Sequence, residues 1–302
     1  MIIDYHAHTF PEALAPRALD ALSGRSHLLP FVDGTDRMLA ESMKKNGIDR
    51  SVVLSVATSP AQVTGINDSA ARRMEERERL GLIAYGAMHP DYADYHSELK
   101  RIKELGFPGI KLHPVYQGAD LDDIRLLRIY DRCAELGLAV VLHGGFDIGF
   151  PGVKRCSPQM ALHALRELKA VRTDRAGRED SDALPEADPA HPGFRFVLAH
   201  MGGWLEWEDV LRLAPEMLEA GPVYLDTAFS LGRFRPLTDG YWKESDTAML
   251  SDRLFVRIVR AYGPGRILFG TDSPWSDQGE TIRHLRSLSL TPEELRTILE
   301  AK

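Results

Sequence analysis

The chain has 302 residues, of which 44% are hydrophobic and 27% charged, so it can bury one large core or two medium ones. Acidic residues outnumber basic ones and give a net charge of −7, and no basic run is dense enough to hold a polyanionic backbone, which argues against nucleic acid as a partner. Cys133 and Cys156 are the only cysteines and form no Cys-x-x-Cys pair, so the sequence offers neither a disulfide framework nor a thiolate zinc cage.

The first residues, Met-Ile-Ile-Asp, have neither the basic patch nor the apolar stretch of a secretory signal, and no uncharged apolar run reaches about 20 residues. We therefore expect a soluble, cytoplasmic protein from a reducing compartment that acts on a small molecule and does not bind membranes. The composition is compatible with a homo-oligomer.

Short apolar or β-branched runs recur along the chain and predict eight strands: Ile2–Tyr5, Ser51–Ala57, Leu82–Ala87, Gly109–Leu112, Ala139–Leu142, Arg195–Ala199, Val223–Asp226 and Arg266–Phe269. Between most of them, apolar residues spaced by three and four predict amphipathic helices at Met38–Lys45, Glu98–Leu105, Ile124–Leu136, Met160–Leu168, Val210–Leu218 and Leu254–Tyr262.

Strands that alternate with helices imply parallel pairing, and eight such units favour an α/β fold of the closed (β/α)8 TIM barrel type. The alternative is an open doubly wound sheet, but no Gly-x-Gly-x-x-Gly follows the first strand. No Gly/Ser linker divides the chain, so we expect a single domain over residues 1–302.

Three longer segments interrupt this alternation. Thr9–Gly34 and Phe229–Ser245 follow the first and seventh strands and leave the C-terminal strand ends, where barrel enzymes build their sites, so both are lid candidates. Thr173–Pro192 is rich in charged residues, Ala and Pro, and precedes the sixth strand on the opposite face. We expect it to be a solvated loop without a catalytic role.

Polar side chains stand at the ends of five predicted strands. His6 and His8 end the first strand and project from the same face of an extended chain, which is a metal-ligand spacing. Further strand ends carry Lys111 and His113, His143, His200, and Asp272. Singly, a histidine there is more often a hydrogen-bonded structural residue and an aspartate a helix cap. Jointly, packing gives no reason to gather them at one rim, and they predict a metal site.

The order Asp4-x-His6-x-His8, His143, His200 and Asp272, the last within Phe269-Gly270-Thr271-Asp272-Ser273-Pro274-Trp275, resembles the amidohydrolase superfamily. It is most similar to the amidohydrolase-2 branch, which includes hydrolases, hydratases and metal-dependent decarboxylases related to aminocarboxymuconate semialdehyde decarboxylase. The resemblance covers nearly the whole chain.

The resemblance implies that His6, His8, His143 and Asp272 bind one divalent metal, most simply zinc, with manganese or another divalent ion as the alternative. It also implies that His200 contacts the metal-bound water or the substrate, so that His200 and Asp272 are the catalytic residues. A carboxylate at Asp272 can in addition accept a proton. Asp4 is expected behind the ligands, holding an imidazole by its other nitrogen or closing the barrel floor.

Lys111 permits three interpretations. As an ammonium it would contact a substrate carboxylate, with His113 assisting from the same face. In binuclear members of the superfamily a lysine at this strand end is carboxylated and bridges two metals. Alternatively, Lys111 is a structural residue.

The segment after the seventh strand carries Arg233 and Arg235 beside several aromatic residues. Cations on a barrel-top loop of an acidic protein suggest recognition of a substrate carboxylate, whereas the simpler interpretation is a solvated loop.

Together these features predict a metal-dependent hydrolase that attacks a small carboxylated or cyclic substrate with a metal-activated water. Nonoxidative decarboxylation by the same family, a lyase reaction, is the alternative. From other classes, we considered a phosphoesterase of the polymerase-and-histidinol-phosphatase type, whose closing Asp-x-His pattern is not matched, and a non-catalytic binding protein.

Overall fold

The computed structural model of the chain describes residues 1–176 and 193–300. In this structure, eight parallel strands follow one another around a barrel in chain order. The strands are β1 (Ile3–Ala7), β2 (Arg50–Leu54), β3 (Leu82–Ala87), β4 (Gly109–Leu112), β5 (Ala139–Leu142), β6 (Phe196–Leu198), β7 (Val223–Asp226) and β8 (Ile267–Leu268). The barrel closes where the Tyr5 amide donates to the Phe269 carbonyl at 2.7 Å and the Asp272 amide donates to the His6 carbonyl at 2.7 Å.

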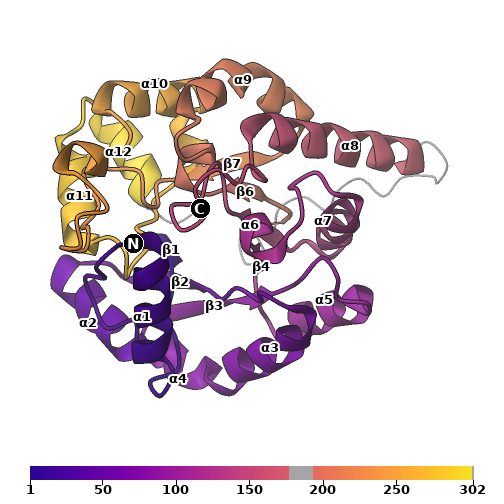
Figure 1. Cartoon of the computed structure of the whole chain (residues 1–302). Coiled ribbons are helices and arrows are strands. Elements are labelled where there is room, and N and C mark those ends of the chain that lie inside the picture. Colours follow the sequence, from indigo (N-terminus) through magenta and orange to yellow (C-terminus); the bar gives the residue numbers. More distant parts are fainter. Residues whose placement is uncertain (177–192, 301–302) are drawn as a thin grey trace.

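Helices form a ring outside the strands, and the colours of Figure 1 run around this ring in chain order. They are α1 (Ala15–Ser26), α2 (Asp36–Asn46), α3 (Val63–Arg72), α4 (Met74–Arg79), α5 (Tyr95–Glu104), α6 (Pro114–Gln117), α7 (Ile124–Leu136), α8 (Pro158–Ala176), α9 (Trp207–Ala220), α10 (Asp252–Tyr262), α11 (Gln278–Ser287) and α12 (Pro292–Leu299). Parallel neighbouring strands need crossover connections of this kind, and the helices supply them. The predicted (β/α)8 barrel is therefore confirmed.

Sequence signals explain the ends of the predicted helices. Thr35 caps α2 by accepting a hydrogen bond from the Met38 amide, and Gly47 ends the helix in the left-handed conformation. Asp123 and Gly137 bound α7 in the same way, and α7 has the predicted limits. The helices that periodicity missed are short, such as the single turn of α6, or interrupted, as α3 and α4 are at Arg73.

The first residues of the segment predicted as a loop, 173–192, are helical instead. α8 continues through Thr173 to Ala176, and residues 177–192 lie outside the described part of the chain. Within the described residues, no helix combines the length and the apolar character that a membrane span requires.

Strand side chains alternate between two buried groups. Val52 and Leu54 of β2, with Ala139 and Val141 of β5, belong to a group drawn from strands only, so this group fills the barrel interior. The intervening residues pack outward against the helices. Continuing the alternation of β5 by one step brings the His143 side chain to the interior at the C-terminal mouth of the barrel.

Candidate metal centre and cavity

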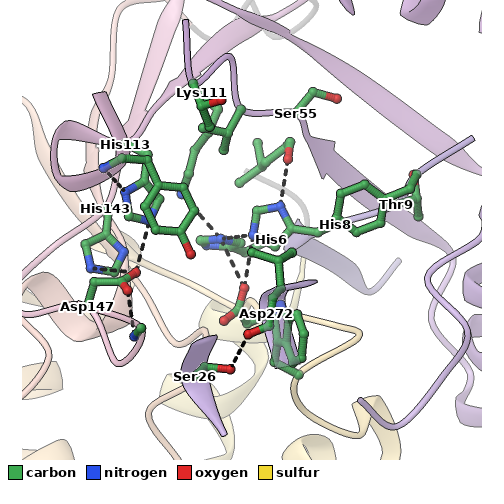
Figure 2. A pocket seen from close by; sticks show the side chains of 18 of the residues that line it. His6, His8, Thr9, Ser26, Ser55, Lys111, His113, His143, Asp147 and Asp272 are labelled. Carbon is green, nitrogen blue, oxygen red and sulfur yellow. Dashed lines mark hydrogen bonds and ion pairs between the residues drawn. The ribbon is translucent and has the colours of Figure 1, made fainter. Parts of the chain in front are cut away.

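A cavity of about 650 Å³ opens at the C-terminal ends of the strands. The polar residues that the sequence predicts at strand ends all line it: His6, His8, Lys111, His113, His143, His200 and Asp272. Figure 2 shows all of these side chains except His200, pointing from several strands toward a common space. The strand-end positions therefore converge as expected of a barrel enzyme.

Three of the predicted ligands form one tight group. The Nε2 atoms of His6 and His8 lie 3.2 Å apart, and Oδ1 of Asp272 lies 3.5 Å from the first and 3.1 Å from the second. All three offer a ligand atom within 4.8 Å of the others. Burial raises the pKa of the Asp272 carboxyl, but the hydrogen bond with His8 and the nearby imidazoles lower it to about 2.

Hydrogen bonds on the far sides of the two rings determine where their protons are. Nδ1 of His6 lies 2.8 Å from Oδ2 of Asp226, and Nδ1 of His8 lies 2.7 Å from the Leu54 carbonyl oxygen. Both oxygens are acceptors, which assigns the ring protons to the Nδ1 atoms. Burial, followed by the charge of Lys111, holds the pKa of His6 well below its usual value, so this ring is neutral.

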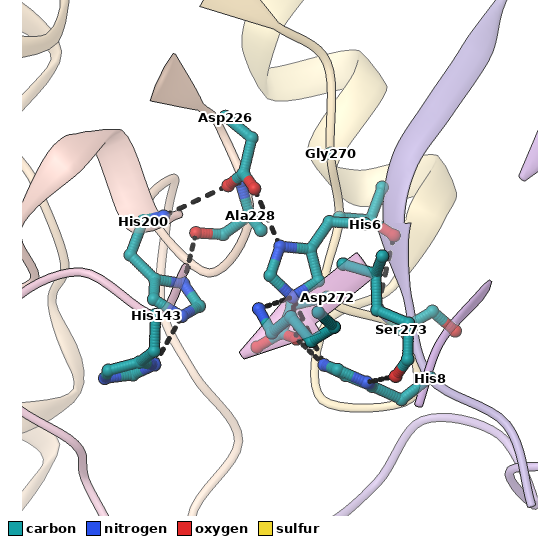
Figure 3. Close-up of polar contacts among 12 residues, drawn as sticks. His6, His8, His143, His200, Asp226, Ala228, Gly270, Asp272 and Ser273 are labelled. Carbon is teal, nitrogen blue, oxygen red and sulfur yellow. Dashed lines mark hydrogen bonds and ion pairs between the residues drawn. The ribbon is translucent and has the colours of Figure 1, made fainter. Parts of the chain in front are cut away.

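Both Nε2 atoms therefore face the same small space as a carboxylate oxygen (Figure 3). Three acceptor atoms this close together need a cation or a shared proton among them. Two imidazoles and a carboxylate are ligands that suit a divalent transition metal, and each ring is oriented by a hydrogen bond on its other nitrogen. The residues present thus fit a divalent metal ion.

His143 is not part of this group of three. Its Nδ1 faces Nε2 of His200 at 3.1 Å, while its Nε2 lies 3.1 Å from the Phe146 carbonyl oxygen. His200 in turn places Nδ1 3.0 Å from the carbonyl oxygen of Ala228. Both carbonyls take the outer ring protons, so two lone pairs meet between His143 and His200, and this contact also needs a cation or a shared proton.

The loop that carries His143 depends on glycine. Gly145 has φ of +80°, and a side chain there would collide with the backbone of Trp204, which follows β6. The close approach of the two loops brings His143 and His200 together.

A second group of potential ligands consists of His113, His143 and Asp147. Nδ1 of His113 accepts from the Tyr116 amide, which leaves the Nε2 proton to face Oδ2 of Asp147 at 3.3 Å. The other carboxylate oxygen accepts from the Gly149 amide at 2.8 Å. Every contact pairs a donor with an acceptor, so this group is held by hydrogen bonds and fits a metal less well than the first.

Lys111 is almost fully buried, and its Nζ lies 3.4 Å from Nε2 of His6. Burial lowers its pKa to about 8, an effect partly opposed by the charges of Asp226 and Asp272. The amine therefore lies next to the group formed by His6, His8 and Asp272. Substrate contact and a bridging carbamate both stay proposals for this residue.

Asp4 does not touch an imidazole ring. Its carboxylate accepts hydrogen bonds from the amide and hydroxyl of Thr271 and from the Gln278 side chain, and so ties β1 to the segment after β8. Of the two expectations for Asp4, the geometry matches closure of the barrel. The residue that holds an imidazole by its other nitrogen is Asp226, the last residue of β7. The sequence analysis missed it, although a polar residue ending an apolar strand was the available signal.

Arg233 and Arg235 do not line the large cavity, which corrects the expectation that they bind substrate there. Arg233 donates to the Glu244 carbonyl at 2.7 Å and to the Thr247 hydroxyl at 2.9 Å, and the Arg235 guanidinium lies over the Phe31 ring. Both guanidinium groups are therefore engaged by residues of their own loop or of segment 9–34. The cavity instead takes Arg25 from α1 and Arg73 from the end of α3, two residues that the sequence analysis did not single out.

The two lid candidates are joined to each other. Trp242 donates to the Ser26 carbonyl at 2.9 Å, His27 pairs with Asp239 at 2.7 Å, and the Leu29 amide donates to Arg235. Segment 9–34 lines the cavity with residues that include Phe10, Leu14 and Leu22. Apart from Phe229, which lines the cavity, the segment after β7 thus supports the cavity rim from outside.

Comparisons with known proteins agree with this architecture. A family model described as amidohydrolase, that of the amidohydrolase-2 family, matches residues 3–301. No curated protein matches the chain.

Three solved structures illustrate the structural likeness. One is 2,6-dihydroxybenzoate decarboxylase from Rhizobium, with 15% identity, coverage of 99% of this chain and 95% of that chain, and a TM-score of 0.60. The second is dihydroxybenzoic acid decarboxylase from Polaromonas sp. JS666 with manganese and 2-nitroresorcinol, with 16% identity, coverage of 98% and 93%, and a TM-score of 0.61. The third is 5-carboxyvanillate decarboxylase from Novosphingobium aromaticivorans with manganese and 4-hydroxy-3-methoxy-5-nitrobenzoic acid, with 14% identity, coverage of 100% and 94%, and a TM-score of 0.63. At these identities the likeness shows the fold.

Proposed function

Since the chain belongs to the amidohydrolase-2 family, we propose that it is a metal-dependent enzyme that decarboxylates a small aromatic acid without a redox step. The observation that carries the proposal is the charge of the cavity around the ligand group. Among the described residues, Arg25, Arg73 and Lys111 line it against two carboxylates, Asp147 and Asp272. A divalent ion adds further positive charge, and such a site favours an anionic substrate.

The remaining lining supports a planar substrate body. Aromatic side chains reach the cavity from several loops: Phe10, Tyr116, Phe146, Trp204, Phe229 and Trp275. Rings and aliphatic side chains with a few converging polar groups are typical of pockets for ring-bearing small molecules. The similar structures that are named as decarboxylases of hydroxylated benzoic acids support the same class.

We assign His6, His8, His143 and Asp272 as the ligands of one divalent metal, either manganese or zinc. When bound there, the metal supplies a Lewis acid for substrate oxygens. Lys111 and Arg25 are placed to contact substrate anions. The aromatic lining excludes water from the ring.

Decarboxylation breaks the bond between the ring carbon and the carboxylate, releases carbon dioxide, and leaves the electron pair on the ring carbon, which then takes a proton. Nδ1 of His200 donates to the Ala228 carbonyl, so only Nε2 is free to carry the proton. His200 would first take up a proton from solvent at Nε2 and then give it to the ring carbon. Asp272, with its pKa near 2, stays ionised and serves as a ligand.

Hydrolysis of a lactone or amide is the second candidate, because the same ligand group suits it and the family includes hydrolases. It would require a water next to the scissile carbonyl, with Asp272 or His200 accepting its proton.

The deciding experiment incubates manganese- and zinc-loaded protein with hydroxybenzoic acids carrying a labelled carboxylate and, in parallel, with aromatic lactones and amides. The proposal expects labelled carbon dioxide and the matching phenol, and no product from the His6→Ala variant. Lactone or amide cleavage without carbon dioxide from any acid would replace decarboxylation by hydrolysis.

A further inference from the structure

A cluster of two arginines and one aspartate stands beside the cavity, away from the strand ends. Arg73 follows α3 and lines the cavity, and its side chain is 25% exposed. Arg77 of α4 is 1% exposed, and Asp36, the first residue of α2, is 12% exposed. Thr9, next to the predicted ligand His8, also lines the cavity and joins this cluster.

Asp36 is already engaged by the inner arginine. Arg77 donates through Nε to Oδ2 at 3.0 Å and through Nη2 to Oδ1 at 3.2 Å, which is a bidentate ion pair. The Thr9 hydroxyl donates to the same Oδ1. One carboxylate is therefore largely used by one buried guanidinium.

Arg73 donates to the same Asp36 carboxylate. Its Nη1 donates to Oδ2 of Asp36 at 3.1 Å and its Nε to the Ser69 carbonyl at 3.4 Å, and within residues 1–176 and 193–300 no partner is recorded for its Nη2. Nη1 of Arg77 is buried, and it too has no hydrogen-bond partner in the described part of the chain. Glu76 influences Arg73 electrostatically but is exposed to solvent.

The cluster thus holds one buried and one half-buried cation against one largely buried anion, and Nη2 of Arg73, the arginine that lines the cavity, has no partner among the described residues. Burying a cation without a full partner is costly, and an added anion would remove that cost. The nearby lining consists of small or apolar residues of α3, such as Gly65 and Ile66, which leave room for a ligand to extend toward Arg73.

We infer that Arg73 forms a second anion-binding subsite, separate from the metal ligands, and that the preferred substrate is an elongated aromatic acid with a second carboxylate at its far end. This inference rests on the proposed function for the end of the substrate that reacts. The guanidinium suits a carboxylate because its paired N–H groups match the two oxygens.

The test measures binding of benzoate, isophthalate, terephthalate and biphenyl-4,4′-dicarboxylate to the manganese-loaded protein by calorimetry. At least one dicarboxylate should bind more tightly than benzoate. Arg73→Ala should weaken that dicarboxylate about 10- to 150-fold, the effect of losing one charged hydrogen bond, and weaken benzoate much less, so that the preference for the dicarboxylate is lost. Arg73→Lys, which keeps the charge, should weaken it less.

Arg72→Ala is the matched control, because Arg72 is the exposed neighbour on the same helix and does not line the cavity. It should bind every probe as the unchanged protein does. The inference is overturned if no dicarboxylate is preferred over benzoate, or if the preference persists in Arg73→Ala. If dicarboxylate binding depends on Arg73 but no acid loses carbon dioxide, the subsite stands and the proposed decarboxylation fails.

Discussion

His6 and Asp226, 220 residues apart in the chain, meet through a 2.8 Å contact between Nδ1 and Oδ2. Both side chains are buried, and Oδ1 of the same carboxylate accepts from the His200 and Ala228 amides. One aspartate at the end of β7 therefore orients a proposed metal ligand and positions the backbone of the proposed proton donor.

Asp226→Asn should weaken metal binding about 10- to 100-fold, the usual effect of removing a carboxylate that orients a ligating histidine. The amide keeps an oxygen for the two backbone donors but presents an NH2 group, which cannot accept the His6 proton. Competition with a chelator measures the affinity. Asp239→Asn is the control, because Asp239 pairs with His27 at 2.7 Å outside the cavity lining. Equal affinity in both variants would show that the Asp226 contact does not orient the ligand.

The purified protein should contain about one divalent ion per chain, because ligand atoms of His6, His8 and Asp272 converge on one small space, whereas the contacts of the His113 group pair donors with acceptors. Elemental analysis gives the stoichiometry, and chelation followed by addition of manganese or zinc should remove and restore activity. Two ions per chain would instead support a carbamate on Lys111 or a filled site at His113.

His200→Asn should keep the metal and lose about 10²- to 10⁴-fold in kcat, the range for removal of a general acid. His143→Ala should lose metal, because His143 is proposed as a ligand. Metal content and turnover are measured on both variants. Complete loss of metal from His200→Asn would make that residue a ligand and leave the proton donor to another group.

The Asp36 cluster should make the protein sensitive to acid. Burial raises the pKa of the Asp36 carboxyl, but its hydrogen bonds and ion pair with Arg77 bring it below the ordinary value of 3.8. A carboxyl with a lower pKa in the folded state stabilises the protein at pH above its unfolded value, and this contribution is lost as pH falls through that value and below.

Asp36→Asn should therefore lower the free energy of unfolding by about 3–5 kcal/mol at pH 7, because it leaves Arg77 buried without its partner. The deficit should stay nearly constant down to about pH 4 and shrink as the pH is lowered through 3.8 and below, and denaturant unfolding at each pH measures it. Asp68→Asn, which removes the partly exposed partner of Arg101, should cost less than about 1 kcal/mol. A deficit that does not change with pH would assign the role of Asp36 to packing.

The sequence by itself determined the barrel and the rim on which its chemistry stands. Strand and helix periodicities are local properties, so β5 and α7 have the predicted limits, and a residue that ends a parallel strand must face the same rim as its neighbours. That is why His6, His143 and Asp272 could be named as cavity residues from their positions alone.

Only the tertiary structure decided which polar groups meet. The partner of His6 is on β7, and periodicity carries no information about contacts across 220 residues. The directions of the arginine side chains could not be predicted for the same reason: Arg233 donates to Glu244 and Thr247 of its own loop, whereas Arg73, which also pairs with Asp36, lines the cavity. The direction of a long side chain depends on which acceptors the folded neighbours leave free, and the linear sequence does not specify those.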